Sequence, residues 1–388
     1  MHITDAQRRA RLGRRHLLAT RGTAVEAAAA AVIGLHSSDP ATVHLSARAR
    51  VKRFDTKQLE DALYERRSLV RMLGMRRTMF VVDRATAAVM DAACTQALAP
   101  NERRKLTQLL EAQAIATDGA RWLRRVEQLA LDALTELGEA TATQLTALVP
   151  DLKLKLRMGE GKKWGADVGV STRVLFLLAT EGRIVRGRPL GTWISSQYRW
   201  APTDAWIGPL APIAPVEART ELLRRWLHSF GPGTLRDITW WTGWSQRDAN
   251  IALRAVDAVE VTLDDADPGY VLPDDTAAVR SSRPWVALLP GLDPTVMGWK
   301  ERDWYLGDHG PKLFDRNGNA GPTVWSDGRI VGGWAQRADG QIVVELLEPV
   351  APPVAAAIER EAGALTTWLN GIVVTPRFRT PLERALAT

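Results

Sequence analysis

The sequence predicts an α+β protein of three tandem winged-helix units followed by a C-terminal β-rich subdomain. Two observations support this prediction. An order of helices followed by a β hairpin recurs three times along the chain, and from Arg283 onward the sequence changes to short apolar runs separated by glycine turns. We therefore place the three units at residues 1–120, 121–205 and 206–280, and the β-rich subdomain at residues 281–388.

The first unit is predicted from apolar spacing and capping residues. Two β-prone runs, Leu69–Leu73 and Thr78–Val82, are separated by Gly74–Arg77, which suits a hairpin with Arg76 and Arg77 at its tip. Apolar residues three and four apart predict the helices. These helices are Leu12–Leu35 with a break at Gly22, Ala41–Val51, and a helix that begins at Asp55 or Thr56 and ends near Glu65.

The second and third units repeat this order, and each contains a short helix that follows a glycine turn and an N-cap. In the second unit the helices are Trp122–Leu137, a short helix after Gly138, and Ser171–Glu181, with wing strands at Gly182–Gly187 and Gln197–Trp200. In the third unit they are Leu222–Phe230, a short helix ending near Trp241, and Gln246–Val256 behind Ser245, with a hairpin of Val259–Leu263 and Gly269–Leu272.

The C-terminal subdomain is predicted from four apolar runs and one terminal helix. Gly328 and Gly340 each end a turn that tolerates a positive φ, so they mark hairpins between strands. The predicted strands are Trp285–Pro290, Pro322–Trp325, Arg329–Trp334 and Gln341–Leu347, and the helix is Pro353–Leu369.

Composition narrows the class of protein. Cys94 is the one cysteine, which excludes an internal disulfide, and its small apolar surroundings favour packing over catalysis. The N-terminus leads into an arginine-rich helix rather than an apolar leader, so we expect a cytoplasmic protein. The sequence contains no Walker loop, zinc cluster or dinucleotide fingerprint, so we expect neither a metal nor a cofactor.

Charge is concentrated at the N-terminus. Residues 1–80 hold 16 basic and 7 acidic residues, a net charge of +9, while the whole chain carries +7. A basic end on a near-neutral body favours a surface for a polyanion, although a solvated arginine-rich surface is the alternative. His16 lies on this first basic helix, where we expect it to be exposed.

Five segments in the same order resemble the AlkZ/YcaQ-type winged-helix DNA glycosylases. The first is VIGLHSSDPATVHLSARAR at Val32–Arg50, and the second is ALYERRSLVRMLGMRRTMFVV at Ala62–Val82. The others are WLHSFGPGTLRDITWWTGW at Trp226–Trp244, LLPGLDPTVMGWKERDWYL at Leu288–Leu306 and GPTVWSDGRIVGGW at Gly321–Trp334.

The resemblance implies a curved body that grips duplex DNA as a monomer, associated with the nucleoid, and excises N7- and N3-alkylated purines in base excision repair, in some members also unhooking crosslinks. The family carries a Gln-aliphatic-Gln or Gln-aliphatic-Asp motif where this chain has His36-Ser37-Ser38. The resemblance therefore implies that His36, Ser38 and the adjacent Asp39 form the catalytic turn of the first unit.

The chemistry of such excision asks little of the protein. An N7-alkylated purine is cationic and leaves as a neutral base, so the remaining tasks are to stabilise an oxocarbenium-like sugar and to place a water. His36 is able to position the water and, with an ordinary pKa near neutrality, to take its proton. Ser38 could hold the same water, and Asp39 could stabilise the cation. The alternative is a helix-capping turn whose Ser and Asp residues only cap the next helix.

Basic residues near this turn are candidates for DNA contact, because contacts to phosphate fix position without reading sequence. The alternative for each is a solvated charged face. Arg316, Arg377 and Arg379 are weaker candidates. The stronger candidates are Arg48, Arg50, Lys52, Arg53, Arg66, Arg67, Arg71, Arg76 and Arg77.

Two other classes of function compete with a glycosylase. A non-catalytic winged-helix DNA-binding protein, either a regulator or a lesion sensor, would keep the basic surface and lose turnover. An unrelated metal- or nucleotide-dependent enzyme lacks a supporting motif. A lesion-release assay separates the first alternative from the glycosylase.

Overall fold

The computed structural model describes residues 1–159, 161, 165–264 and 267–388. The predicted helix over Leu12–Leu35 is two helices, α1 (Asp5–Arg15) and α2 (Val25–Ala31), separated by a turn. Helix α3 (Pro40–Arg50) follows, and α4 (Thr56–Glu60) continues as a π-helical turn to Glu65. Asp55 is the cap of α4, because its carboxylate accepts the Lys57 N–H while the Gln58 side chain accepts the Asp55 N–H.

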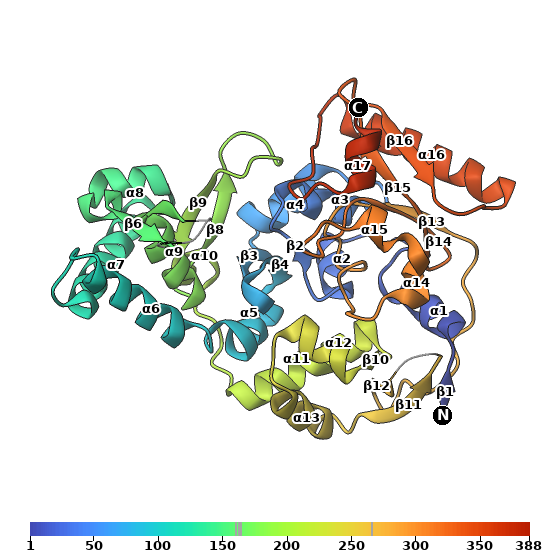
Figure 1. The fold of residues 1–388 in the computed structure, drawn as a ribbon, viewed down its shortest axis with the longest axis horizontal. Coiled ribbons are helices and arrows are strands. Elements are labelled where there is room, and N and C mark those ends of the chain that lie inside the picture. The colour runs from blue at the N-terminus through green and yellow to red at the C-terminus, as the bar shows by residue number, and fades with distance from the viewer. Residues whose placement is uncertain (160, 162–164, 265–266) are drawn as a thin grey trace.

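A six-stranded antiparallel sheet runs through the middle of the molecule (Figure 1). The predicted hairpins of residues 69–82 and 182–200 both contribute to it, so these two segments share one sheet. Strands β3 and β8 meet at a single residue pair, Arg71 opposite Arg186. The strand order is β2 (Leu35–His36), β4 (Met79–Asp83), β3 (Leu69–Leu73), β8 (Ile184–Pro189), β9 (Tyr198–Pro202) and β5 (Ala140–Thr141).

Residues 99–202 form a smaller body, seen on the left of Figure 1, with a hydrophobic core of its own. The sequence assigned residues 99–120 to the first unit, but Leu106 and Leu110 of α6 pack into this second core. Helix α6 packs against helices α7 and α9, which follow it in the chain. The elements are α6 (Ala99–Ala112), α7 (Gly119–Leu137), α8 (Ala142–Leu148), the hairpin β6 (Lys155–Met158) and β7 (Ala166–Gly169), and α9 (Val170–Thr180).

The N-terminus of the chain joins the sheet of the third predicted unit. Strand β1 (His2–Ile3) pairs in parallel with β11 (Val259–Leu263), and His2 lies opposite Thr262. Residues 1–3 therefore belong to the sheet of the third unit rather than to the first. The helices are α11 (Pro215–Phe230), α12 (Leu235–Thr242) and α13 (Gln246–Ala255), and the remaining strands are β10 (Gly233–Thr234) and β12 (Gly269–Val271).

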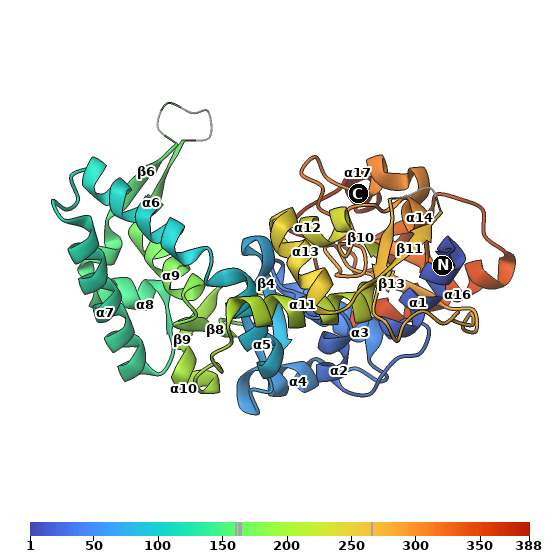
Figure 2. The same ribbon diagram turned by 90° about the horizontal axis from the view of Figure 1, so that it is seen from below.

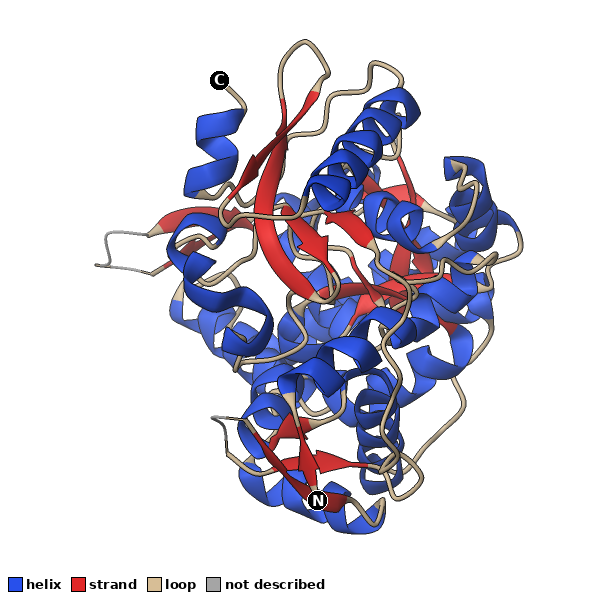
Figure 3. Cartoon of the chain, turned by 90° about the vertical axis from the view of Figure 1, so that its right-hand side faces the viewer, coloured by secondary structure: helices blue, strands red, loops and turns tan. Residues whose placement is uncertain are grey.

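The C-terminal region contains the predicted four-stranded antiparallel sheet. Gly328 and Gly340 have φ of 87° and 89°, as the hairpin turns require. The strands are β13 (Val286–Leu289), β14 (Thr323–Ser326), β15 (Arg329–Gln336) and β16 (Ile342–Leu346). Helix α16 (Pro352–Leu369) lies along this sheet (Figure 3), and α14 (Asp303–Leu306), α15 (Gly310–Leu313) and α17 (Pro381–Leu386) complete the region.

One large core unites the first unit, the third unit and the C-terminal sheet. It contains Leu12, Leu35, Trp226, Trp325 and Leu382, which come from segments far apart in the chain. Figure 2 shows the two bodies side by side, joined near β4, α5 (Arg84–Met90) and β8. No helix in the described part of the chain is both long and apolar enough to span a membrane.

Candidate active site

The turn that contains His36 joins the edge of the six-stranded sheet to helix α3. His36 lies opposite Phe80 of β4, and the Ser37 N–H donates to the Met79 carbonyl at 2.8 Å. These backbone bonds fix the register of the turn. The candidate catalytic residues thus stand on a strand end rather than on a free loop.

His36 is a neutral residue in this environment. Only 9% of it is exposed, and its ring meets the Phe80 ring edge-on with centroids 5.5 Å apart. Burial, together with the nearby Arg76 and against a smaller opposing effect of Asp293, lowers the pKa of His36 to about 3. The near-neutral pKa expected from the sequence is therefore wrong. The imidazole stays uncharged at physiological pH and is a poor proton acceptor there.

The two serines of the turn differ in their contacts. The Ser38 N–H makes a long, 3.5 Å hydrogen bond to His36 Nδ1, which favours the tautomer that carries its proton on Nε2. The Ser38 carbonyl accepts a hydrogen bond from Arg377 at 3.1 Å. The Ser37 hydroxyl is buried and has no hydrogen-bond partner among the described residues.

Asp39 is the N-cap of helix α3, as the capping alternative required. One carboxylate oxygen accepts the Ala41 N–H at 3.0 Å, and the other accepts the Arg377 N–H at 2.8 Å. Both oxygens are thus held by backbone donors. Asp39 ties the start of α3 to the C-terminal segment and fixes the position of the turn between them.

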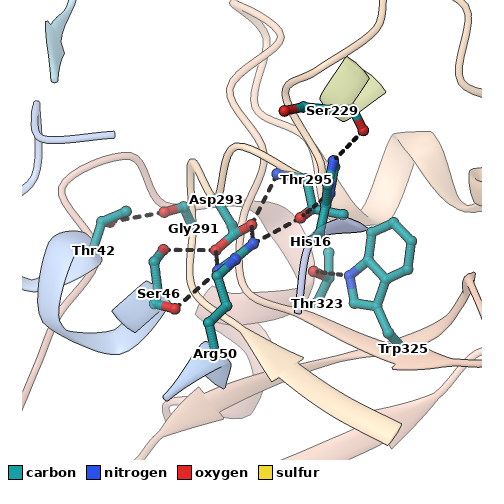
Figure 4. A network of polar contacts seen from close by, with 10 residues as sticks. All are labelled: His16, Thr42, Ser46, Arg50, Ser229, Gly291, Asp293, Thr295, Thr323 and Trp325. Atoms are coloured by element: carbon teal, nitrogen blue, oxygen red, sulfur yellow. Dashed lines mark hydrogen bonds and ion pairs between the residues drawn. The ribbon is translucent and has the colours of Figure 1, made fainter. Parts of the chain in front are cut away.

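Helix α3 is anchored at its other end by a buried ion pair (Figure 4). Arg50 is 0% exposed and makes two hydrogen bonds to Asp293, at 2.7 and 2.8 Å. Ser46 and the Thr295 N–H complete the contacts of that carboxylate. Arg50 is therefore a structural residue, and its assignment to a DNA contact is wrong.

Arg48 was expected to contact DNA and His16 to be exposed, but both are buried. Arg48 is 7% exposed and pairs with Glu361 of α16 at 2.7 Å, so it too is unavailable to DNA. His16 is completely buried, and its ring nitrogens contact the Thr295 hydroxyl at 2.9 Å and the Ser229 carbonyl at 3.1 Å. Partners from distant segments cover this end of the chain.

Several other candidate arginines are already engaged. Arg66 pairs with Glu26 and Asp61, and Arg77 pairs with Glu102. Arg67 stacks on the Trp206 ring at 4.0 Å and donates to the carbonyl of the same residue.

Lys52 and Arg53 are exposed but lie beyond the far end of α3. Eleven helical residues place them roughly 16 Å from the turn. They do not join the residues around His36.

Of the candidate arginines, Arg76 lies next to the turn that contains His36. Its guanidinium lies 4.0 Å from the centroid of the Trp240 ring, and Arg302 approaches the same ring at 4.9 Å. The Met75–Arg77 turn packs against α12, so it is not the projecting wing tip that the sequence predicted. Within the described chain, Arg76 has no ion pair, and the charge of Arg302 lowers its pKa in addition to the effect of burial.

A second group of arginines adjoins the turn through Arg377. A hollow of about 600 Å³ is lined by Arg377 together with residues of the 314–317 loop and of α17. The sequence did not identify Arg302 and Arg384 as candidates, because only the residues that lie near them in the folded chain indicate such a role. Arg316, Arg377 and Arg379, the weaker candidates, are brought together here with Arg384.

The chain belongs to the AlkZ-like DNA glycosylase family, whose model matches residues 29–368. The resemblance seen in the sequence is thereby confirmed. Among solved structures, the fold is similar to that of the Streptomyces sahachiroi DNA glycosylase AlkZ, with a TM-score of 0.69 over 97% of this chain and 99% of that chain. Sequence identity is 19%, so this likeness concerns the fold. A search of curated proteins finds no match.

Proposed function

We propose that this protein is a monofunctional DNA glycosylase that hydrolyses the N-glycosidic bond of N7- or N3-alkylated purines in duplex DNA, and that it acts as a cytoplasmic, nucleoid-associated monomer. In this proposal the three helix-and-hairpin segments are winged-helix units that grip the duplex. The observation that carries the proposal is the position of His36. It stands within the family match, at a strand end, beside Arg76, which forms no ion pair within the described residues.

The proposed role of His36 is to position water rather than to act as a base. With Nδ1 accepting from the Ser38 N–H, the Nε2–H is free to donate to a water oxygen. A buried, neutral imidazole keeps that role across physiological pH. The leaving purine is already cationic and departs without protonation, so the remaining demand is to place a water against the sugar, and the proton that this water loses passes to solvent.

Ser38 and Asp39 support this geometry in the proposal. Ser38 orients the imidazole through its backbone N–H, and its partly exposed side chain offers a second polar group for the same water. Asp39 keeps the turn in place, and its negative charge lies close to where the sugar cation would form.

The test is release of N7-methylguanine from methylated duplex DNA under single-turnover conditions with saturating enzyme. We expect His36→Ala to slow release by about 10²-fold, near the low end for proton-transfer or water-positioning groups. His36→Gln, which restores the family residue, should retain part of the rate. DNA affinity and melting temperature should change little. His228 is an exposed histidine on α11, so His228→Ala is the matched control and should leave the rate unchanged.

The pH profile separates the two roles of His36. A water-positioning neutral imidazole gives a rate that does not fall between pH 8 and about pH 5, since its pKa is about 3. A fall centred near pH 6.5 that disappears in His36→Gln would contradict this role. If the wild-type protein releases no alkylated purine, the non-catalytic DNA-binding function replaces the glycosylase.

A further inference from the structure

The two bodies join their sheets at a pair of arginines. Arg71 of β3 lies directly opposite Arg186 of β8, so the two side chains project from the same face of the sheet. Both converge on one ring, because the guanidinium carbons of Arg71 and Arg186 lie 4.4 and 5.2 Å from the centroid of Tyr198. Arg186 also lies 4.2 Å from the centroid of the Trp200 ring.

No counter-charge accompanies this pair in the part of the chain that the structure describes. Arg71 is 2% exposed, and its Nε and Nη1 are buried without a hydrogen-bond partner. The Nε of Arg186 and the hydroxyl of Tyr198 are likewise buried and unpartnered. Like charges directly opposite one another destabilise a sheet, and an unpaired buried charge adds to that cost. Within the described residues, these buried N–H and O–H donors thus have no acceptor.

A hollow borders the Arg186 side of this pair. It has a volume of about 690 Å³ and is lined by Arg186 and Tyr198 together with Leu73 and Met79. Leu73 is two residues from Arg71 on the same strand, so the two side chains share the face that the hollow borders.

His36 projects from the other face. It pairs with Phe80, whose side chain points opposite to that of its neighbour Val81, and Val81 is the residue paired with Arg71. The two arginines therefore project from the face of the sheet opposite to His36, although the charges of Arg377 and Asp39 act on Arg186 and Tyr198.

We propose that the Arg71–Arg186 pair is a binding site for a phosphate-type oxyanion. Guanidinium groups present parallel N–H donors that match the oxygens of a phosphate, and the Tyr198 hydroxyl supplies a further donor. One arginine comes from each body, so a bound anion links the two bodies across the β3–β8 junction. Free phosphate and a DNA phosphodiester share this chemistry.

Thermal unfolding in sodium phosphate, against sodium chloride of equal ionic strength, tests the site without any measurement of excision. At phosphate concentrations tenfold above its Kd, we expect the melting temperature of the wild-type protein to rise by about 2 °C. Arg186→Met should abolish that rise. Arg188→Met is the matched control, because Arg188 lies two residues further along β8 and pairs with Glu65 instead. It should retain the rise.

Phosphate also stabilises proteins by exclusion from their surfaces. The site is therefore tested by comparing the rise in melting temperature between Arg186→Met and Arg188→Met. An equal rise in Arg186→Met and Arg188→Met would overturn the site, as would a wild-type protein with no phosphate-specific rise. If Arg186→Met does not fold, Arg71→Met replaces it in the same comparison, and an unchanged rise in that variant likewise overturns the proposal.

Duplex binding then identifies the source of the anion. If a DNA phosphodiester occupies the site, free phosphate competes with DNA beyond the effect of ionic strength, and Arg186→Met lowers the salt slope of binding by about one. If free phosphate is the natural occupant, DNA binding is unaffected by both changes. Either result supports an oxyanion site, and neither depends on glycosylase activity.

Discussion

The arginines of the N-terminal helices and those around the sheet junction differ in how their charge is compensated. Arg48 and Arg50 on α3 are buried against Glu361 and Asp293. Arg76 and Arg186, in contrast, lie over aromatic rings and form no ion pair within the described chain. The excess of positive charge in residues 1–80 therefore does not mark a single basic surface. Which arginines remain available to an anion is decided by partners that come from elsewhere in the chain.

The largest effect that would test this comparison is on stability. Arg50→Met leaves Asp293 buried without its cation and should lower the free energy of unfolding by about 3–5 kcal/mol. Arg76→Met makes the same chemical change at a guanidinium that has no ion pair within the described residues and should cost less than about 1 kcal/mol. Urea unfolding of both variants measures the difference. The double variant Arg50→Met with Asp293→Leu should recover much of the loss, and equal costs for the two single variants would break the comparison.

Acid sensitivity sharpens the same contrast, because the N-terminal histidines are buried with the arginines. Burial lowers the pKa values of His16, His36 and His44 to about 3, below the 6.5 of an exposed imidazole. The unfolded chain then binds protons that the folded chain does not. Their stabilising contribution is present above pH 6.5 and is lost as the pH falls toward 3, on the order of 1 kcal/mol per histidine for each pH unit.

The measurement is the free energy of unfolding in urea at pH 7.5, 6 and 5. His44→Phe removes one of these groups at a position that packs against Trp193, with ring centroids 4.9 Å apart. It should reduce the proton uptake on unfolding by about one. The same pH slope in this variant and in the wild-type protein would show that His44 titrates normally in the folded state.

The smallest effect concerns DNA binding. Duplex affinity should fall steeply with salt, and Arg76→Ala should weaken it by about three- to tenfold while lowering the salt slope by about one. Arg66→Ala is the control, since Arg66 is exposed but pairs with Glu26 and Asp61. Fluorescence anisotropy at several salt concentrations measures both. If Arg66→Ala weakens binding as much as Arg76→Ala, ion pairing does not decide which arginines contact DNA.

Local structure was largely predictable because its signals lie within a few residues. Thr141 with Gln144 forms a capping box, and Ser245 caps α13, so both helices begin where their caps indicate. The C-terminal hairpins turn at Gly328 and Gly340, as their sequences require. These features depend on side chains three or fewer positions from the backbone groups that they satisfy.

The long-range contacts were not predictable from such signals. Asp293 lies 243 positions from Arg50, and nothing near either residue shows that they meet. The β3–β8 junction likewise joins two strands whose sequences show only arginines within short apolar runs. The candidate site predicted from the sequence lies on the turn between β2 and α3, but the pKa of His36 depends on burial that only the assembled core creates.

The β1–β11 pairing and the Arg50–Asp293 contact have a consequence for synthesis on the ribosome. Residues 2–50 need partners near Thr262 and Asp293, which follow more than two hundred residues later. At ordinary elongation rates that delay is roughly 10 to 50 seconds. Residues 99–202, in contrast, hold a complete core of their own and can fold as soon as they emerge. We therefore expect residues 99–202 to fold before the N-terminal helices, whose apolar faces stay uncovered until their partners are made.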